Sequence, residues 1–351
     1  MKPYFLIILF ALFSLHDLLA AENCKRVNLL YKKWGLFPRQ MPLYDQGKTG
    51  ICYAFAASQM VDYWRETHGL RLKNMKMGQS TPVYAALLAR VYGKKSIMSG
   101  NHTLDGGKIL DALMGVKKNG MCNELVVKRS IEKFTKKKNV NINHFLYEVQ
   151  RYLTFHEPGV SLGNYFLAPF ESLRKRFNAP DINFDKVSNA MKPYTKNRNF
   201  VGFMKDLFSE CFKKENIYLN SKKIPEVETQ HVDRGATILT HKVKELLDSQ
   251  NPQPIGISYC ENILGDKNFQ GIWIGAERPM PKRGCYGHAS IIVGKRERGG
   301  QCQFLVRNTY GTHCNYDWDC AQNKKKETIG IWVNAKRLMQ NTKKIYYFKK
   351  P

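Results

Sequence analysis

Three features are scarce in this 351-residue sequence: acidic residues, long apolar runs after the N-terminus, and internal repeats. Lys and Arg number 56 against 29 Asp and Glu, a formal net charge of +27. Such a charge attracts anionic partners such as nucleic acid, acidic lipid or an acidic cell-wall polymer, but does not choose among them. No specific nucleic-acid motif is present. Beyond the first residues, no segment reaches the roughly twenty continuous apolar residues that a membrane-spanning helix needs.

The N-terminus has the pattern of a secretory signal. Lys2 precedes an apolar run over residues 5–15, and small residues follow at positions 20–21. His16 and Asp17 interrupt the run, so that it is too short to span a membrane. We therefore expect residues 1–21 to be a signal peptide, and residues 22–351 to form a secreted or periplasmic protein.

Nine cysteines form an odd set, which in an exported chain leaves at least one thiol without an intramolecular partner. They are Cys24, Cys52, Cys122, Cys211, Cys260, Cys285, Cys302, Cys314 and Cys320. If Cys52 stays free, the other eight suffice for four disulfides, whose connectivity the sequence leaves open. A zinc site at residues 313–320 is an alternative, but its spacing matches no common structural zinc pattern. We expect neither a metal nor a cofactor.

The hydrophobic period changes along the chain. Residues 52–68, 80–92 and 108–118 have helical spacing with stop signals after them, whereas short β-rich runs separated by turn residues fill the last third. Residues 123–235 are rich in basic clusters and mix helix with loop. This order predicts an α+β fold with a helical N-terminal lobe, an antiparallel C-terminal lobe and a site in the cleft between them.

One cysteine has the setting of a nucleophile. The stretch "DQGKTGICYAFAAS" places Cys52 after a glycine-bearing loop, where an apolar helix begins. The positive end of a helix dipole favours a thiolate, which is the reactive form of the side chain. We therefore expect the pKa of Cys52 to be lowered.

A histidine and an asparagine could complete such a site. His288 lies in "GCYGHASIIVGK" at the entrance to an apolar strand, and Asn308 ends the next strand, "CQFLVRN". Antiparallel pairing of these two strands would bring Asn308 to His288. Its amide oxygen could then accept a hydrogen bond from the imidazole and hold the ring in place.

Together these blocks resemble the signature of the papain-like cysteine peptidases. In that family Gln, Cys, His and Asn follow in the order seen here for Gln46, Cys52, His288 and Asn308. The resemblance implies that Cys52 is the nucleophile, His288 its acid–base partner and Asn308 the orienting residue. It also implies that Gln46 and the backbone N–H of Cys52 form the oxyanion hole.

The resemblance extends to substrate-binding positions and departs from the family elsewhere. It implies that Gly106, Gly107 and Ala289 line the substrate groove. A family disulfide would join the positions of Thr49 and Leu104, where both cysteines are missing.

Two family tryptophans are tyrosines here, Tyr53 and Tyr310. The distance in sequence from Cys52 to His288 exceeds the roughly 130–150 residues usual for the family. An insertion at about 123–235 accounts for the excess. Only residues 22–45 separate the predicted signal peptide from Gln46, so that the long inhibitory pro-region of the family is not expected. We hypothesise that part of the insertion overhangs the cleft, the alternative being a distal elaboration.

Three functions fit these residues. The leading hypothesis is an exported cysteine peptidase that hydrolyses polypeptides through a Cys52 acyl-enzyme. The second is a peptidoglycan amidase or endopeptidase with the same Cys–His–Asn chemistry, which the basic charge favours mildly. The third is a non-enzymatic basic binding module on the same scaffold. The presence of Gln46, Cys52, His288 and Asn308 argues against this third function.

Overall fold

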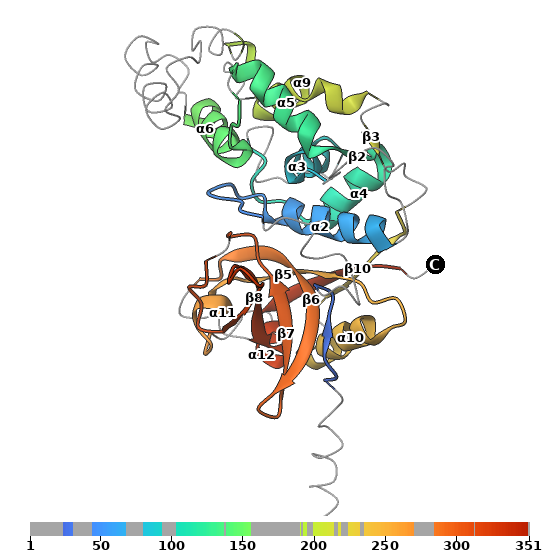
Figure 1. The fold of residues 1–351 in the computed structure, drawn as a ribbon. Helices are drawn as coiled ribbons and strands as arrows, with labels where there is room; N and C mark the ends of the chain where they lie inside the picture. The colour runs from blue at the N-terminus through green and yellow to red at the C-terminus, as the bar shows by residue number, and fades with distance from the viewer. Residues whose placement is uncertain are drawn as a thin grey trace, which may run out of the picture.

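A computed structural model describes most of the chain (Figure 1). It describes residues 24–30, 44–67, 80–92, 103–136, 138–155, 190, 192–194, 199–213, 217–218, 224–231, 235–269, 284–311 and 313–349. The predicted signal peptide and residues 156–189 of the predicted insertion lie outside these ranges.

The first half of the described chain is helical, as the sequence predicts. Its three central helices are α2 (Cys52–Thr67), α3 (Pro82–Tyr92) and α4 (Ile109–Asn119). Proline suits the first position of α3, because its missing N–H would have no partner there. Residues 82–89 of α3 are all buried, because α2, α4 and a later helix pack around them. The core of this half is therefore built on α3.

The predicted insertion adds helices on the side of this core that faces away from the sheet (Figure 1). They are α5 (Glu124–Thr135), α6 (Ile142–Phe155), α9 (Phe200–Leu207) and the short 3-10 helix η1 (Ser209–Phe212). A two-stranded ribbon of β2 (Met121–Cys122) and β3 (Ile217–Tyr218) and the disulfide Cys122–Cys211 fasten this layer. Asn123 caps α5 by accepting from the Leu125 N–H at 2.7 Å.

The second half is an antiparallel sheet. Its strands run β4 (Val227–His231), β10 (Thr342–Phe348), β5 (Ile255–Cys260), β6 (Gly287–Arg298), β7 (Gln301–Arg307), β9 (Thr328–Asn334) and β8 (Asp319–Gln322). A short strand, β1 (Val27–Asn28), also pairs with β6. Because β4 lies at the edge of this sheet, the predicted insertion rejoins the main body before residue 235. The α+β class, with helices first and an antiparallel sheet second, is confirmed.

Strand β6 links the two halves. Helix α2 packs on the face of β6 that is turned toward the helical half. Helix α10 (Ala236–Asp248) packs against the opposite face, and its neighbour α12 (Ala335–Gln340) packs against β7 and β9 (Figure 1). Residues 288–295 of β6 are consequently all buried. Burial on both faces explains why the sequence reads there as a continuous apolar run rather than an alternating one.

Four disulfides account for eight of the nine cysteines, and Cys52 is the remaining free thiol. The odd number of cysteines thus leaves one free thiol, as predicted, and that thiol belongs to Cys52. Cys314 and Cys320 are joined to each other, so that neither is a free thiolate for the alternative zinc site.

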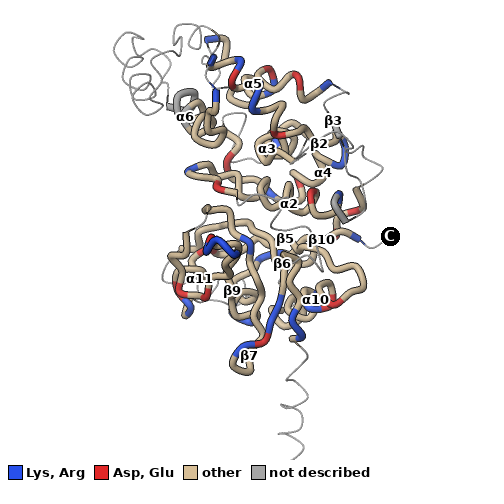
Figure 2. Tube along the Cα trace, viewed as in Figure 1, with Lys and Arg blue, Asp and Glu red and all other residues tan. Residues whose placement is uncertain are grey.

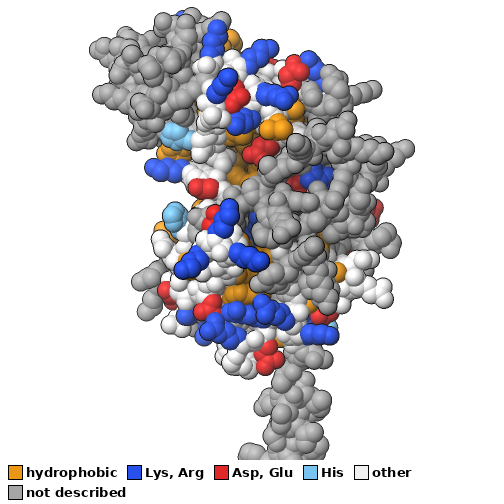
Figure 3. Space-filling model, viewed as in Figure 1, with side chains coloured by type: hydrophobic (Ala, Val, Ile, Leu, Met, Phe, Trp, Pro, Cys, Tyr) orange, Lys and Arg blue, Asp and Glu red, His pale blue; other side chains and the backbone are white. Residues whose placement is uncertain are grey.

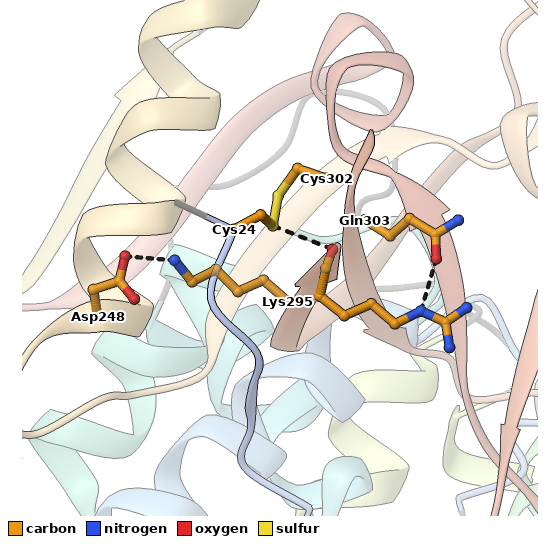
Figure 4. The surroundings of a disulfide bond; sticks show 6 residues. Cys24, Asp248, Lys295, Cys302 and Gln303 are labelled. Carbon is orange, nitrogen blue, oxygen red and sulfur yellow. Dashed lines mark hydrogen bonds and ion pairs between the residues drawn. A yellow bond between two sulfur atoms is a disulfide. The ribbon is translucent and has the colours of Figure 1, made fainter. Parts of the chain in front are cut away.

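One disulfide fastens the N-terminal segment to the central sheet (Figure 4). Cys24 is bonded to Cys302 on β7, and Val27 pairs with Lys295 on β6. The side chain of Lys295 is fully buried, and its ammonium lies 2.5 Å from the Asp248 carboxylate on α10. An unpaired ammonium would be costly at this depth, so that the ion pair helps to hold α10 against the sheet.

Basic residues are spread over both halves rather than gathered in one place (Figure 2). On the face in Figure 3, Lys and Arg are interspersed with Asp and Glu. No helix in the described part of the chain combines the length and the apolar character needed to cross a bilayer.

Replacing both Cys24 and Cys302 by serine should lower the free energy of unfolding by about 2–5 kcal/mol. The bond joins residues 278 positions apart, and longer closed loops restrict the unfolded chain more. Denaturant unfolding under non-reducing conditions measures this loss. The control replaces Cys314 and Cys320, which are only six positions apart and should cost less. Equal losses for the two pairs would contradict the explanation.

Candidate active site

Cys52 is the first residue of α2 and is partly exposed. The backbone N–H of Ala289 hydrogen-bonds its thiol, and so does that of Tyr53. Ala289 follows His288 directly on β6. The structure therefore places the thiol at the junction of the helical half and the sheet, one backbone position from the imidazole.

The His288 ring is buried, with 5% of the residue exposed, and is fixed on several sides. Its Nε2 lies 2.8 Å from the Asn308 amide oxygen. The Tyr310 ring stacks on it with centroids 5.1 Å apart, and Tyr259 contacts it edge-on at 5.6 Å. These contacts leave the imidazole little freedom to rotate.

Asn308 is itself held by hydrogen bonds that define which way its amide points. Its oxygen also accepts from the Thr309 N–H at 2.8 Å and the Ser290 hydroxyl at 3.3 Å, while its nitrogen donates to the Tyr316 hydroxyl at 3.1 Å. Since that oxygen accepts, the Nε2 of His288 carries the proton. In the neutral ring Nδ1 is then the basic nitrogen.

Gln46 is buried in the loop before α2. Its amide nitrogen donates to the Thr49 carbonyl at 3.1 Å, and its amide oxygen accepts from the Thr309 hydroxyl at 2.6 Å. A backbone bond of 2.8 Å from Gln46 to the Thr309 carbonyl runs alongside. Gln46 is thus tied to Thr309, the residue that follows Asn308. An amide nitrogen carries two hydrogens, and Thr49 accounts for one of them.

The two glycines have different reasons to be glycine. Gly106 has φ +69°, a conformation that other residues rarely adopt, and nothing lies within 4 Å of where a Cβ would be. At Gly107 a Cβ would come within 2.3 Å of the Tyr53 ring. The Tyr53 hydroxyl donates to the Leu104 carbonyl at 2.8 Å, which fixes that ring. Packing against Tyr53 therefore explains why residue 107 is a glycine. A role of Gly106, Gly107 or Ala289 in substrate binding remains a prediction.

Hydrogen bonds connect the segment before α2, which holds Thr49, to the segment before α4, which holds Leu104. Asp105 accepts from the Gly50 N–H at 2.7 Å and from the Gln150 amide at 2.5 Å. The Gln150 amide oxygen accepts in turn from the Leu104 N–H at 3.3 Å. Because Gln150 belongs to α6, the predicted insertion supplies part of this connection.

The same helix reaches the loop that carries Gln46. The Asn143 amide donates to the Asp45 carbonyl at 2.5 Å, and the Lys48 ammonium lies 5.9 Å from the centre of the Tyr147 ring. Helix α6 thus supports the rim of the site, whereas α9 packs on α3 and α5 packs on α9, on the side away from the sheet (Figure 1). Whether the insertion also limits access to the site remains a prediction.

The expected lowering of the Cys52 pKa is wrong for this structure. Loss of water around the sulfur raises the pKa of Cys52 to about 11, and this outweighs the hydrogen bonds from Ala289 and Tyr53, which lower it. Burial likewise lowers the pKa of His288 below its usual value, against the opposing effects of Glu261 and Asn308. The favoured resting state is therefore a neutral thiol beside a neutral imidazole.

Sequence reasoning missed several residues of the site, and Glu261 is the most significant. Its carboxylate lies 4.0 Å from the Nδ1 of His288 and accepts from the Tyr310 hydroxyl at 3.1 Å. Only the pairing of β5 with β6 places it there. Thr309 directly follows Asn308, but only the fold shows that its hydroxyl bonds Gln46. Nothing in the sequence around Tyr316 indicates that its hydroxyl accepts from Asn308.

The structure resembles solved structures of papain-like cysteine proteases, the family that the sequence motifs indicate. Xylellain, a cysteine protease from Xylella fastidiosa, is 16% identical with a TM-score of 0.44, over 93% of this chain and 86% of that one. The bromelain protease from Ananas comosus is 12% identical with a TM-score of 0.39, over 89% and 94%. A structure from a study of the mite allergens Blo t 1 and Der p 1 is 12% identical with a TM-score of 0.41, over 92% and 74%.

No family model and no curated protein matches the chain. TM-scores below 0.5 at such low identities do not identify a reaction. The case for a function therefore rests on the geometry of the site itself.

The ionisation of Cys52 can be measured directly. The thiolate absorbance, taken as the difference between the protein and its Cys52→Ala variant, should be absent at neutral pH. It should appear with a midpoint near 11, because burial favours the thiol. The other eight cysteines are in disulfides and do not contribute. A midpoint below the usual value of about 8.5 would show instead that an ion pair forms at rest.

Proposed function

We propose that the protein is an exported cysteine peptidase that hydrolyses peptide bonds through Cys52. The observation that carries the proposal is a free cysteine at a helix start, hydrogen-bonded by Ala289, next to an imidazole that Asn308 orients at 2.8 Å. A nucleophile, a base and a residue that orients the base form the pattern expected of nucleophilic catalysis.

The reaction follows from the ionisation of the pair. As the sulfur attacks the scissile carbonyl carbon, its proton moves to the Nδ1 of His288, the basic nitrogen of the neutral ring. The imidazolium then gives that proton to the leaving amine as the C–N bond breaks. Water, deprotonated by the same nitrogen, hydrolyses the thioester and restores the thiol.

Two donors fit the oxyanion that develops during attack. They are the side-chain amide of Gln46 and the backbone N–H of Cys52. Gln46 is rigidly held by Thr49 and Thr309, so that its amide is organised before substrate arrives. Such preorganised donors are effective because they need no rearrangement as charge develops, and one donor contributes a factor of about 10²–10³ to kcat.

A peptidoglycan amidase or endopeptidase is the second candidate, because it would use the same three residues. The net charge of +27 favours an acidic or wall-bound substrate. Parallel assays on unstructured polypeptides and on purified peptidoglycan separate the two enzymes. If protein with an intact, reactive Cys52 hydrolyses neither substrate, the non-enzymatic binding module is favoured.

Export is part of the proposal. Four disulfides are typical of oxidising compartments, and the N-terminal sequence has the pattern of a signal peptide.

Replacing Cys52 by alanine should reduce peptide hydrolysis by about 10⁴-fold or more, because no other group in the site can form the acyl-enzyme. His288→Ala should have a comparable effect. His241→Ala, on the exposed side of α10, is the matched control and should retain activity. Cleavage of fluorogenic peptides measures the rates, and thermal melting checks that each variant is folded. Hydrolysis retained by folded Cys52→Ala protein would overturn the proposed function.

A further inference from the structure

A carboxylate from a turn outside the Cys–His–Asn set faces the reactive side of the His288 ring. Glu261 immediately follows β5, and its Oε2 lies 4.0 Å from the Nδ1 of His288. The Nε2 on the opposite side of the ring is already engaged with Asn308. The nitrogen that must take and give the proton is therefore the one that faces Glu261.

The position of Glu261 is well determined by its surroundings. In the β5–β6 register Tyr259 pairs with His288, and the disulfide Cys260–Cys285 joins the last residue of β5 to the segment just before β6. The Glu261 N–H donates to the Tyr286 carbonyl at 2.8 Å. The carboxylate is thus fixed relative to the strand that carries the imidazole.

Tyr310 holds the carboxylate end. Its ring stacks on His288, and its hydroxyl donates to the Glu261 Oε2 at 3.1 Å while lying 3.5 Å from Nδ1. This one tyrosine therefore fixes both the plane of the imidazole and the place of the negative charge beside it.

Glu261 is the one full charge among the described groups that face His288. The others are Cys52 from α2, Tyr259 from β5 and Tyr310 after β7. Burial raises the pKa of each of these three groups, so that they are neutral near neutral pH. A glutamate is ordinarily ionised there.

We propose that Glu261 is a positioning residue that stabilises the imidazolium form of His288 while the acyl-enzyme forms. The inference rests on the proposed function. As the C–S bond forms, the Cys52 proton moves to Nδ1 and the ring gains a positive charge. Glu261 faces that charge and takes no proton. The proton then leaves with the amine as the C–N bond breaks.

The need for such a group follows from the depth of the ring. Burial disfavours the imidazolium, and Asn308 offers only a neutral dipole to compensate. A negative charge at 4.0 Å supplies the stabilisation that the missing water would have given. The same charge disfavours the Cys52 thiolate, but there it acts less strongly than the hydrogen bonds from Ala289 and Tyr53.

The first test needs no catalysis. In Cys52→Ala protein, the pKa of His288 is measured by NMR of labelled histidine, with and without Glu261→Gln. Removing the negative charge should lower the pKa of His288 by about one unit. At a pH above the pKa of both proteins, the fraction of protonated His288 then falls about tenfold. Tyr310→Phe keeps the stacked ring but frees the carboxylate, and should lower the pKa by less. Glu245→Gln removes an exposed charge on α10 and should change nothing.

The second test uses the active protein. Glu261→Gln should lower kcat for peptide hydrolysis by about tenfold with little change in KM, because the charge is needed only after the proton has moved. Glu245→Gln again serves as control. A fall in thermal stability with no change in either the His288 titration or kcat would mean that Glu261 is merely structural.

The outcomes separate this inference from the proposed function. If Cys52→Ala is inactive but Glu261→Gln alters neither kcat nor the His288 titration, the inference is wrong and the proposed function stands. If Cys52→Ala retains activity, the proposed function falls, and the imidazolium role of Glu261 in acylation falls with it, whatever the titration shows.

Discussion

The packing of the start of α2 against the start of β6 is the contact on which the site depends. It places Cys52 against the Ala289 N–H, and therefore beside His288. Neither element can shift without cost, because the N-terminal half of α2 is almost entirely buried and β6 is covered on both faces. The loops that complete the site are tied to this contact by short hydrogen bonds, through Thr309 on the sheet side and Asp105 on the helical side. Cys52 and His288 are thus positioned by the packed core.

Burial has two consequences for this arrangement. It fixes the imidazole between Asn308 and the aromatic rings of Tyr259 and Tyr310, and it also removes the water that would stabilise charge. The Cys52 thiol and the His288 ring are consequently neutral at rest. In the proposed reaction, a full proton transfer therefore accompanies attack by the sulfur. Residues that stabilise the imidazolium then matter more than those that stabilise a resting thiolate. Glu261 has the right charge and position for that task.

Much of the architecture could be predicted from the sequence. The helix beginning at Cys52, the strand carrying His288 and the antiparallel neighbour ending at Asn308 all follow from hydrophobic period and turn residues. They lie where expected, and Asn308 does reach His288. The odd cysteine count predicted at least one free thiol, and the free one is Cys52, which its position at a helix start had marked as the nucleophile. These features depend on local pattern or on adjacent strands, which is the information that a single sequence carries best.

The remainder depends on contacts between distant segments. Glu261 approaches His288 only because β5 pairs with β6 in one particular register. Gln150 lies 45 residues from Asp105, on a helix that no motif connected with the site. The pKa of Cys52 was predicted in the wrong direction because the helix start is a local feature, whereas desolvation is the sum of everything packed around the sulfur. Such collective properties need the folded structure.

The most direct measurement is to trap and map the reactive residue. The protein is treated with a peptide-like epoxide at several pH values, digested without reduction, and the modified residue is identified by mass spectrometry, with His288→Ala protein treated in parallel. Modification of Cys52 alone, lost in the His288 variant, is the result that this account predicts. Labelling elsewhere, or labelling of Cys52 that does not depend on His288, would show that the two residues do not act together.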